Sequence, residues 1–319
     1  MSLPRLFLLS TLVLFLGIGF AAWAKKRKTA PPIAVEAVVV KPAPVAVVPK
    51  VVAKKEAPLP RDENLPEVNR IAQLFAFDSS KLPFVETISY TSRVPWLKDR
   101  PAWIADYASH FETSRHFIAR SLNRKADYFT QKVAPGDRFN VFKRNAQVQF
   151  HLLIDLKRCK MWFYALDAEA GERTLLKTYR VGLGRAEGSR SSGSLTPMGK
   201  YSLGEKVAIY KPGTMGTFQD KKTEMIRIFG TRWIPFDREL EGCSDPAKGF
   251  GIHGAPWIAD TSGQLIEDRS QIGKYSSDGC IRMTAEDMEE LFAIIITKPT
   301  VVEIVRDFAE ARLPGAERK

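Results

Sequence analysis

The stretch VQFHLLIDLKRCKMWFYAL, residues 148–166, decides the fold class of this chain. Two apolar runs rich in branched and aromatic residues flank the short polar pair Lys157–Arg158. Runs of this length and composition on either side of a turn are typical of a β-hairpin. We therefore predict that a strand-rich domain begins at about Gln147.

Further strand patterns follow the hairpin at short intervals. They are LLKTYRVGLG (175–184), TPMGKYSLG (196–204), EMIRIFGTRWIPF (224–236) and the closing TVVEIV (300–305). This spacing predicts a predominantly β domain over residues 147–306, followed by a tail at 307–319.

One helix is expected inside this β domain. Thr284 fits its N-cap and Asp287 lies three residues later, which is an acidic relative of the capping box. The buried face of this helix would be formed by Met288, Leu291, Phe292 and Ile295.

The preceding segment, residues 61–146, is predicted to be mostly helical. Pro101 fits the first position of a helix that would run to about Leu122. His110 and His116 lie six residues apart, whereas metal ligands on one helical face need spacings of three or four, so we expect partly buried histidines. APGDRFNVFKR (134–144) predicts a turn and a strand. The apolar stripe of the helix would comprise Trp103, Ile104, Tyr107, Phe111, Phe117, Ile118 and Leu122.

The N-terminus carries an apolar segment followed by a basic one. Leu6–Ala24 is uncharged and close to the length that crosses a bilayer, and its Ala-Trp-Ala end also fits a signal-peptidase site. A signal peptide or a membrane anchor over residues 1–24 is therefore expected. KKRK at 25–28 would tend to stay on the cytoplasmic side, but we favour export because the spacer and the domain that follow make most sense outside.

Residues 25–60 are rich in Pro, Ala, Val and Lys, and predict a disordered, semi-rigid spacer. Half of the net charge of +12 lies here, with eight Lys or Arg against two Glu. Such a basic tail suits anionic envelope surfaces at least as well as DNA. Because no zinc-finger, homeodomain or RNP-like pattern accompanies it, we do not expect nucleic acid as a partner.

The chain has three cysteines, so an exported form leaves at least one without an intrachain partner. Cys159 lies in a predicted strand and Cys243 in a loop, and either can be structural or bridged to the other. Cys280 differs, because in SSDGCIRM (276–283) it follows Gly279 in a turn of small residues just before the capped helix. Such a turn can aim backbone N–H groups at one point, as an oxyanion requires.

A cysteine thiol with a pKa of about 8.5 needs a base or a positive field to attack well near neutral pH. His253 is the candidate base, because KGFGIHGAPW (248–257) surrounds it with glycines that allow close approach. From these residues alone, nucleophilic and structural roles both remain open. Zinc is disfavoured since no CxxC or HxxxH occurs, and GLGRAEG (182–188) is not a dinucleotide-binding motif.

GIHGAPW (251–257), followed by SSDGCIRM and then by a helix and a strand, resembles the catalytic domain of YkuD-type L,D-transpeptidases. LLIDLKRCKMWFYALD, KTYRVGLG and TPMGKYSLG resemble strands and the Thr-Pro-x-Gly turn of that family. The resemblance covers about residues 148–305. It implies a β-sandwich-like domain with one capping helix, which transfers peptidoglycan stem peptides through a cysteine thioester without metal or organic cofactor.

The resemblance also implies roles for individual residues. Cys280 would be the nucleophile and His253 its general base, and Gly279 with the N–H of Cys280 would contribute to an oxyanion hole. Ser277 fills the serine position of the motif. The implied substrate-binding residues are Arg282 near the substrate carboxylate, Trp257 at the mouth of the cleft, Gly254 and Asp278.

Two features depart from the family pattern. Asp278 stands where Ser-His-Gly-Cys has its histidine, and its negative charge should raise the pKa of the neighbouring thiol. The span between His253 and Cys280 also contains the extra stretch ADTSGQLIEDRS (259–270), which predicts a loop. This loop can be a lid, a recognition element or plain surface.

The expected function is that of a peptidoglycan L,D-transpeptidase acting on donor and acceptor stem peptides. The alternatives are an L,D-carboxypeptidase and a wall-binding structural protein with weak catalysis, which Asp278 keeps open. A peptidase on proteins is disfavoured, because neither a papain-like nor a caspase-like sequence surrounds the cysteine. We expect the cell envelope as location, in the periplasm or at the outer face of the inner membrane, with residues 61–146 positioning the catalytic domain or contacting glycan.

Overall fold

The computed structural model describes residues 65–123 and 132–318. The predicted export segment and the predicted spacer lie outside these residues. Within the described part, no helix is both long and apolar enough to span a membrane.

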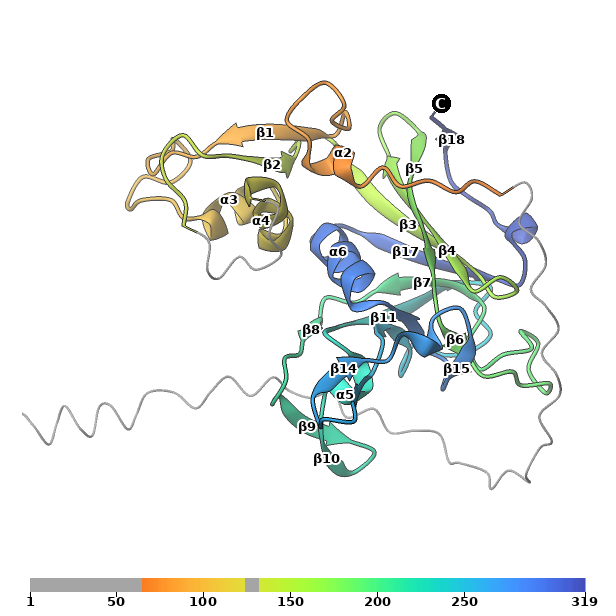
Figure 1. The fold of residues 1–319 in the computed structure, drawn as a ribbon. Coiled ribbons are helices and arrows are strands. Elements are labelled where there is room, and N and C mark those ends of the chain that lie inside the picture. The colour runs from red at the N-terminus through yellow and green to blue at the C-terminus, as the bar shows by residue number, and fades with distance from the viewer. Residues whose placement is uncertain (1–64, 124–131, 319) are drawn as a thin grey trace, which may run out of the picture. The chain divides into compact units, whose positions relative to one another are not determined.

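The largest element is one curled sheet of ten strands (Figure 1). Along one path the strand order is β16-β12-β11-β7-β17-β3-β4-β5-β18, and β8 pairs with β11 beside this path. Strands that are distant in sequence therefore become neighbours. The strands are β3 (Val148–Asp155), β4 (Lys160–Asp167), β5 (Glu172–Arg180), β7 (Gly199–Leu203), β8 (Ala208–Ile209), β11 (Arg232–Glu241), β12 (Gly251–Gly254), β16 (Ile281–Met283), β17 (Thr300–Val305) and β18 (Ala316–Glu317).

The predicted hairpin at 148–166 is confirmed as β3 and β4, which pair antiparallel with Leu152 opposite Phe163. All residues of β3 except Gln149 are buried. Its run is nearly continuously apolar because both faces are covered, as is usual for a strand with a parallel neighbour, here β17. The predicted closing strand at 300–305 is confirmed as β17, but it lies inside the sheet between β7 and β3.

The predicted helix is confirmed as α6 (Ala285–Ile295), which lies against the sheet in Figure 1. The Thr284 side chain caps it by accepting the N–H of Asp287 at 3.1 Å. The four predicted face residues, Met288, Leu291, Phe292 and Ile295, are all buried in the main core.

Three expectations about the β domain need correction. The sheet is continuous, so the domain is not a sandwich of two packed sheets. Within the predicted strand 224–236, residues 226–229 form the short helix α5 (Ile226–Phe229), and β11 starts only at Arg232. The predicted tail adds a 3-10 turn (Phe308–Glu310) and β18, which pairs with β5.

Four two-stranded sheets complete the β structure of the described residues. Two of them border the site described below. They pair β6 with β15 and β13 with β14; the other two pair β1 with β2, and β9 (Met215–Phe218) with β10 (Lys221–Glu224).

The segment before the β domain is not mostly helical. Its described elements are α2 (Ala72–Phe75), β1 (Val85–Ser89), α3 (Ile104–His110), α4 (Arg115–Asn123) and β2 (Arg138–Phe142). The predicted strand at 134–144 is confirmed as β2, although it pairs with β1 and not with the large sheet.

The single helix predicted from Pro101 to about Leu122 is two helices. The helical conformation is interrupted at Glu112, whose φ of 46° lies outside the helical region. Thr113 accepts the N–H of Phe142 at 2.9 Å, and Ser114 accepts that of Phe117 at 3.0 Å. These hydroxyls bind backbone groups in place of helical partners, and this interrupts the first helix and starts the second.

Helix α4 packs against α6 and thereby against the β domain. Ser114 donates to the carbonyl of Ala293, and the ring of His116 lies 5.2 Å from that of Phe292. His110 stacks on Trp96 at 4.2 Å. Both histidines are half-buried, as predicted.

Candidate active site

Two short parallel strands, β12 and β16, bring the predicted base and the predicted nucleophile into one neighbourhood. Their register places His253 opposite Arg282 and Ile252 opposite Ile281. Cys280 immediately precedes β16, and alternate residues of a strand face the same side of a sheet. The register therefore places Cys280, Arg282 and His253 on a common face.

The turn before β16 is held by its own serine. Ser277 ends β15 (Tyr275–Ser277), which pairs parallel with β6 (Leu183–Gly184). Its hydroxyl donates to the Cys280 carbonyl at 2.6 Å and accepts the N–H of Gly279 at 3.1 Å. This closes the turn into a small ring that fixes the backbone around Cys280. A strand, β16, separates the turn from α6, so the turn does not directly precede the helix as expected.

Gly279 is required in this turn. Its φ of 121° is rarely adopted by other residues. A Cβ there would lie 2.8 Å from the Leu195 carbonyl and would overlap the ring of Phe250. Any side chain at position 279 would therefore displace the Leu195 backbone or the Phe250 ring.

Cys280 is half-buried, and burial raises the pKa of its thiol to about 12. A hydrogen bond from the Gly251 backbone and the charge of Arg282 act in the opposite direction, while the charge of Asp278 raises the pKa further. Its Sγ lies 3.7 Å from the carbonyl of Gly249. The resting group is thus a neutral thiol between backbone groups of residues 249 and 251.

His253 is 3% exposed, enclosed by the rings of Phe229 and Trp233. Its Nδ1 lies 2.7 Å from the Gly254 carbonyl. A carbonyl only accepts hydrogen bonds, so this contact assigns the proton to Nδ1 and leaves Nε2 as the acceptor. Burial and then the charge of Arg282 lower the pKa of His253 to about 3, although the carbonyls of Gly254 and Phe229 oppose the shift.

The imidazole is therefore neutral at physiological pH. A neutral thiol and a neutral imidazole favour proton transfer during attack over a preformed ion pair.

The Arg282 side chain does not use all of its N–H donors. Its Nη1 donates to the side chain of Gln271 and lies 3.5 Å from Ser276 Oγ, while its buried Nε has no hydrogen-bond partner within the described residues. Trp257 Nε1 is also buried and unpartnered there. Two buried N–H donors are thus unpaired within the described residues.

Comparison with known proteins agrees with this geometry. Residues 149–304 match the YkuD family, an L,D-transpeptidase catalytic domain. The chain carries a YkuD-family domain. No curated protein matches the chain in sequence.

Solved structures from two bacteria are also similar to parts of the chain. Bd1075 of Bdellovibrio bacteriovorus is 16% identical, with 50% of this chain and 48% of that chain covered and a TM-score of 0.33. The helical cell shape determining protein Pgp2 of Campylobacter jejuni is 15% identical, with 53% and 52% covered and a TM-score of 0.33. The match spans about half the length of each structure.

Within the YkuD domain, Asp278 is exposed and forms an ion pair with Arg185. Asp278 Oδ1 and Arg185 Nη2 are 2.7 Å apart. The predicted direction of its effect on the Cys280 pKa is confirmed, but it is the smallest of the causes, after burial, Gly251 and Arg282. The cation at 185 offsets the charge that the sequence places beside the thiol.

The predicted oxyanion donors differ in availability. The N–H of Gly279 is already donated to Ser277, whereas the N–H of Cys280 makes no hydrogen bond within the described part of the chain. The Cys280 N–H is thus the open donor of the turn, and Gly279 supplies conformation.

The insertion at 259–270 is a hairpin and not a loop. It contains the last residue of β13 (Trp257–Ala259), all of β14 (Leu265–Glu267) and the start of a 3-10 turn (Arg269–Gln271). Glu267 accepts the N–H of Ala285 at 2.5 Å and so binds the first turn of α6. Gln271 at the end of this turn contacts Arg282, which links the hairpin to the site.

Several residues of this site carry no recognisable signal in the sequence. Arg185, Leu195 and Phe250 reach the turn through strand order and loop packing, which no local pattern encodes. No disulfide joins Cys159 and Cys243. In residues 65–123 and 132–318, no three His, Cys, Asp or Glu side chains form a group suited to a metal ion.

Proposed function

We propose that this chain is a peptidoglycan L,D-transpeptidase of the cell envelope, with Cys280 as nucleophile and His253 as general base. The observation that carries the proposal is the neutral, Nδ1-protonated imidazole of His253 on the strand next to the Cys280 turn. The family acts on peptidoglycan stem peptides, and this fixes the substrate class that we propose.

In the first step, His253 Nε2 takes the thiol proton as Sγ attacks the carbonyl carbon of the third residue of a tetrapeptide stem. The N–H of Cys280 donates to the oxygen that becomes negative. The bond to the terminal D-alanine breaks, and the proton held by His253 passes to the departing amine. The product is a thioester on Cys280 together with free D-alanine.

In the second step, the side-chain amine of a neighbouring stem attacks the thioester. His253 takes a proton from this amine and returns it to the leaving sulfur, which restores the thiol. The result is a cross-link between two third residues. Water in place of the amine would release a tripeptide, which is the L,D-carboxypeptidase reaction.

We assign the two open donors of the site to the substrate. Arg282 Nε would bind a carboxylate of the donor stem, because a guanidinium N–H paired with a carboxylate forms a strong, charge-assisted hydrogen bond. Trp257 Nε1 would donate to a peptide carbonyl at the mouth of the cleft. Gly254 orients the base through its carbonyl.

The test is to incubate the full-length chain with disaccharide-tetrapeptide and to analyse the products by mass spectrometry. We expect a cross-linked dimer with loss of D-alanine, which Cys280→Ala abolishes and the matched control Cys243→Ala retains. Tripeptide without dimer would support the carboxypeptidase alternative. Dimer formation by Cys280→Ala would overturn the nucleophile, and binding of unaltered substrate would favour the wall-binding alternative.

A further inference from the structure

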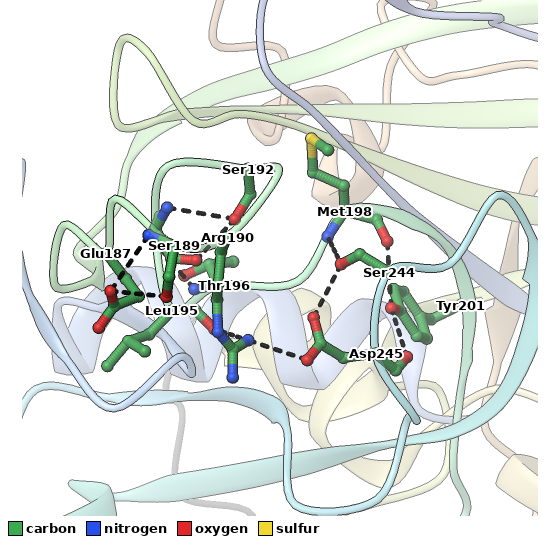
Figure 2. Close-up of polar contacts among 11 residues, drawn as sticks. Glu187, Ser189, Arg190, Ser192, Leu195, Thr196, Met198, Tyr201, Ser244 and Asp245 are labelled. Atoms are coloured by element: carbon green, nitrogen blue, oxygen red, sulfur yellow. Dashed lines mark hydrogen bonds and ion pairs between the residues drawn. The ribbon is translucent and has the colours of Figure 1, made fainter. Parts of the chain in front are cut away.

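Two loops meet beside the turn that holds Gly279 and Cys280, which we call the catalytic turn. One arginine joins the two loops. The first loop, residues 185–198, follows β6, and the second, residues 242–250, leads into β12. Figure 2 shows Arg190 of the first loop directed at Asp245 of the second. Arg190 Nη1 lies 2.9 Å from Asp245 Oδ1 and 3.3 Å from the Leu195 carbonyl. A single guanidinium thus binds both loops.

The same two loops enclose the glycine of the catalytic turn. The Leu195 carbonyl and the Phe250 ring both lie where a Cβ on Gly279 would stand. The oxygen that Arg190 binds is therefore the oxygen that limits the position of Gly279, the residue before Cys280. A continuous set of contacts runs from Asp245 through Arg190 and Leu195 to the turn.

Each loop is also fastened to the scaffold. Leu195 donates its N–H to the Arg185 carbonyl at 2.9 Å, and Arg185 donates its own to the Ser277 carbonyl at 2.9 Å. In the second loop, Asp245 accepts the Tyr201 hydroxyl through its carbonyl at 2.8 Å. Figure 2 shows this contact beside the Arg190 pair. The side chains of Arg190 and Asp245 therefore join two fixed points.

We propose that Arg190, held by Asp245, is a positioning residue for Cys280. It keeps the Leu195 carbonyl against Gly279 and thereby sets the place of the thiol and of the open Cys280 N–H. The inference rests on the proposed function. An arginine suits this task because its planar fork donates in two fixed directions, which a lysine cannot do.

The kinetic test uses full-length variants in the dimer-forming assay. We expect Arg190→Met to lower kcat by on the order of 10-fold to 100-fold, since small displacements of reacting groups have effects of this size. KM and the thermal midpoint should change little, because the pair is half-exposed and such pairs add little stability. Asp245→Asn should act in the same direction, and Arg190→Lys should restore only part of kcat.

The matched control is Arg100→Met, which removes the arginine of an ion pair with Asp106 in the segment before the β domain. It should leave kcat unchanged. Full activity of Arg190→Met, or restoration of wild-type kcat by Arg190→Lys, would overturn the proposal.

A second readout does not depend on the substrate. Iodoacetamide labelling at pH 8, followed by mass spectrometry, compares Cys280 with the fully buried Cys159 in the same molecule. In Arg190→Met, we expect faster labelling of Cys280 at an unchanged rate for Cys159, because the turn loosens locally. Equal labelling of Cys280 in both proteins, or a parallel rise at Cys159, would contradict a positioning role. Absence of turnover by the wild type would reject the proposed function, and labelling would still decide the inference.

Discussion

The large sheet buries two histidines in opposite ways. His151 on β3 is 2% exposed, and its Nε2 lies 2.8 Å from Oε2 of Glu303, which is 3% exposed. His253 on β12 is equally buried, but its hydrogen bonds go to backbone carbonyls and the charge that acts on its pKa is the cation Arg282. One imidazole is matched to a carboxylate, and the other is kept neutral.

The difference shows that the surroundings, and not the residue type, set the state of each imidazole. Burial raises the pKa of Glu303, but the hydrogen bonds from His151 and from the Arg312 backbone outweigh it and lower the pKa below its usual value. Because Arg312 belongs to the C-terminal segment, this pair ties that segment to the sheet. Within the described residues, His253 has no such carboxylate partner.

Substitution of each histidine in turn should give the largest difference between the two sites, measured as kcat. We expect His253→Asn to lower kcat by about 10²-fold to 10⁴-fold, because it removes the proton acceptor. His151→Asn should leave kcat of the folded enzyme within about threefold of wild type, since His151 is not in contact with the site residues described above. Dimer formation under saturating tetrapeptide measures both. Equal losses in the two variants would mean that the sheet, and not the base, controls the rate.

The role of His151 should appear in the stability of the fold. His151→Leu leaves the Glu303 carboxylate buried without its partner, which should lower the free energy of unfolding by about 3–5 kcal/mol. The double variant His151→Leu/Glu303→Met should recover most of this loss, because it also removes the carboxylate that is left without a partner. Urea denaturation at pH 7 measures the difference. A double variant as unstable as the single one would mean that packing, and not the unpaired charge, causes the loss.

The pH dependence of stability should carry the signature of the neutral histidine. The folded pKa of His253 is about 3 and the unfolded value is 6.5, so the unfolded chain binds more protons between these values. Stability is therefore full above pH 6.5 and is lost as the pH falls towards 3, by about 3 kcal/mol at pH 4. His253→Asn should lack this part of the slope.

Urea denaturation at pH 7, 5.5 and 4 tests this expectation. His116, whose pKa burial lowers to about 4, contributes a slope of its own. It is present in both proteins and cancels in the comparison. Parallel curves for the wild type and His253→Asn would contradict the neutral buried imidazole.

The elements that the sequence predicts correctly are those that local pattern decides. The hairpin 148–166 follows from two apolar runs around a polar turn, and α6 follows from Thr284 and its apolar face. The order of strands depends on contacts between distant segments, so neither the place of β17 inside the sheet nor the single continuous sheet could be predicted. The apolar stripe of helical period does not predict the break at Glu112, because the hydroxyl groups of Thr113 and Ser114 override it.

For the proposed site, the sequence provides candidate residues but not their state. Cys280 and His253 are found through their motifs, and strand pairing brings them together. The proton on Nδ1 and the use of the Gly279 N–H by Ser277 depend on three-dimensional contacts. The same holds for Asp278, whose charge is paired with Arg185, a residue far away in the sequence.

The ion pair between Asp278 and Arg185 gives the smallest expected effect. Unlike the two buried histidines, it lies in solvent. Asp278 and Arg185 are exposed, so their influence on Cys280 is screened by solvent. We expect Asp278→Asn to raise iodoacetamide labelling of Cys280 by up to about fivefold and Arg185→Gln to lower it, since the first removes an anion that raises the thiol pKa and the second removes its neutralising partner. Both effects should shrink at high salt. If the change in labelling is the same in high salt, Asp278 acts through the conformation of the turn and not through its charge.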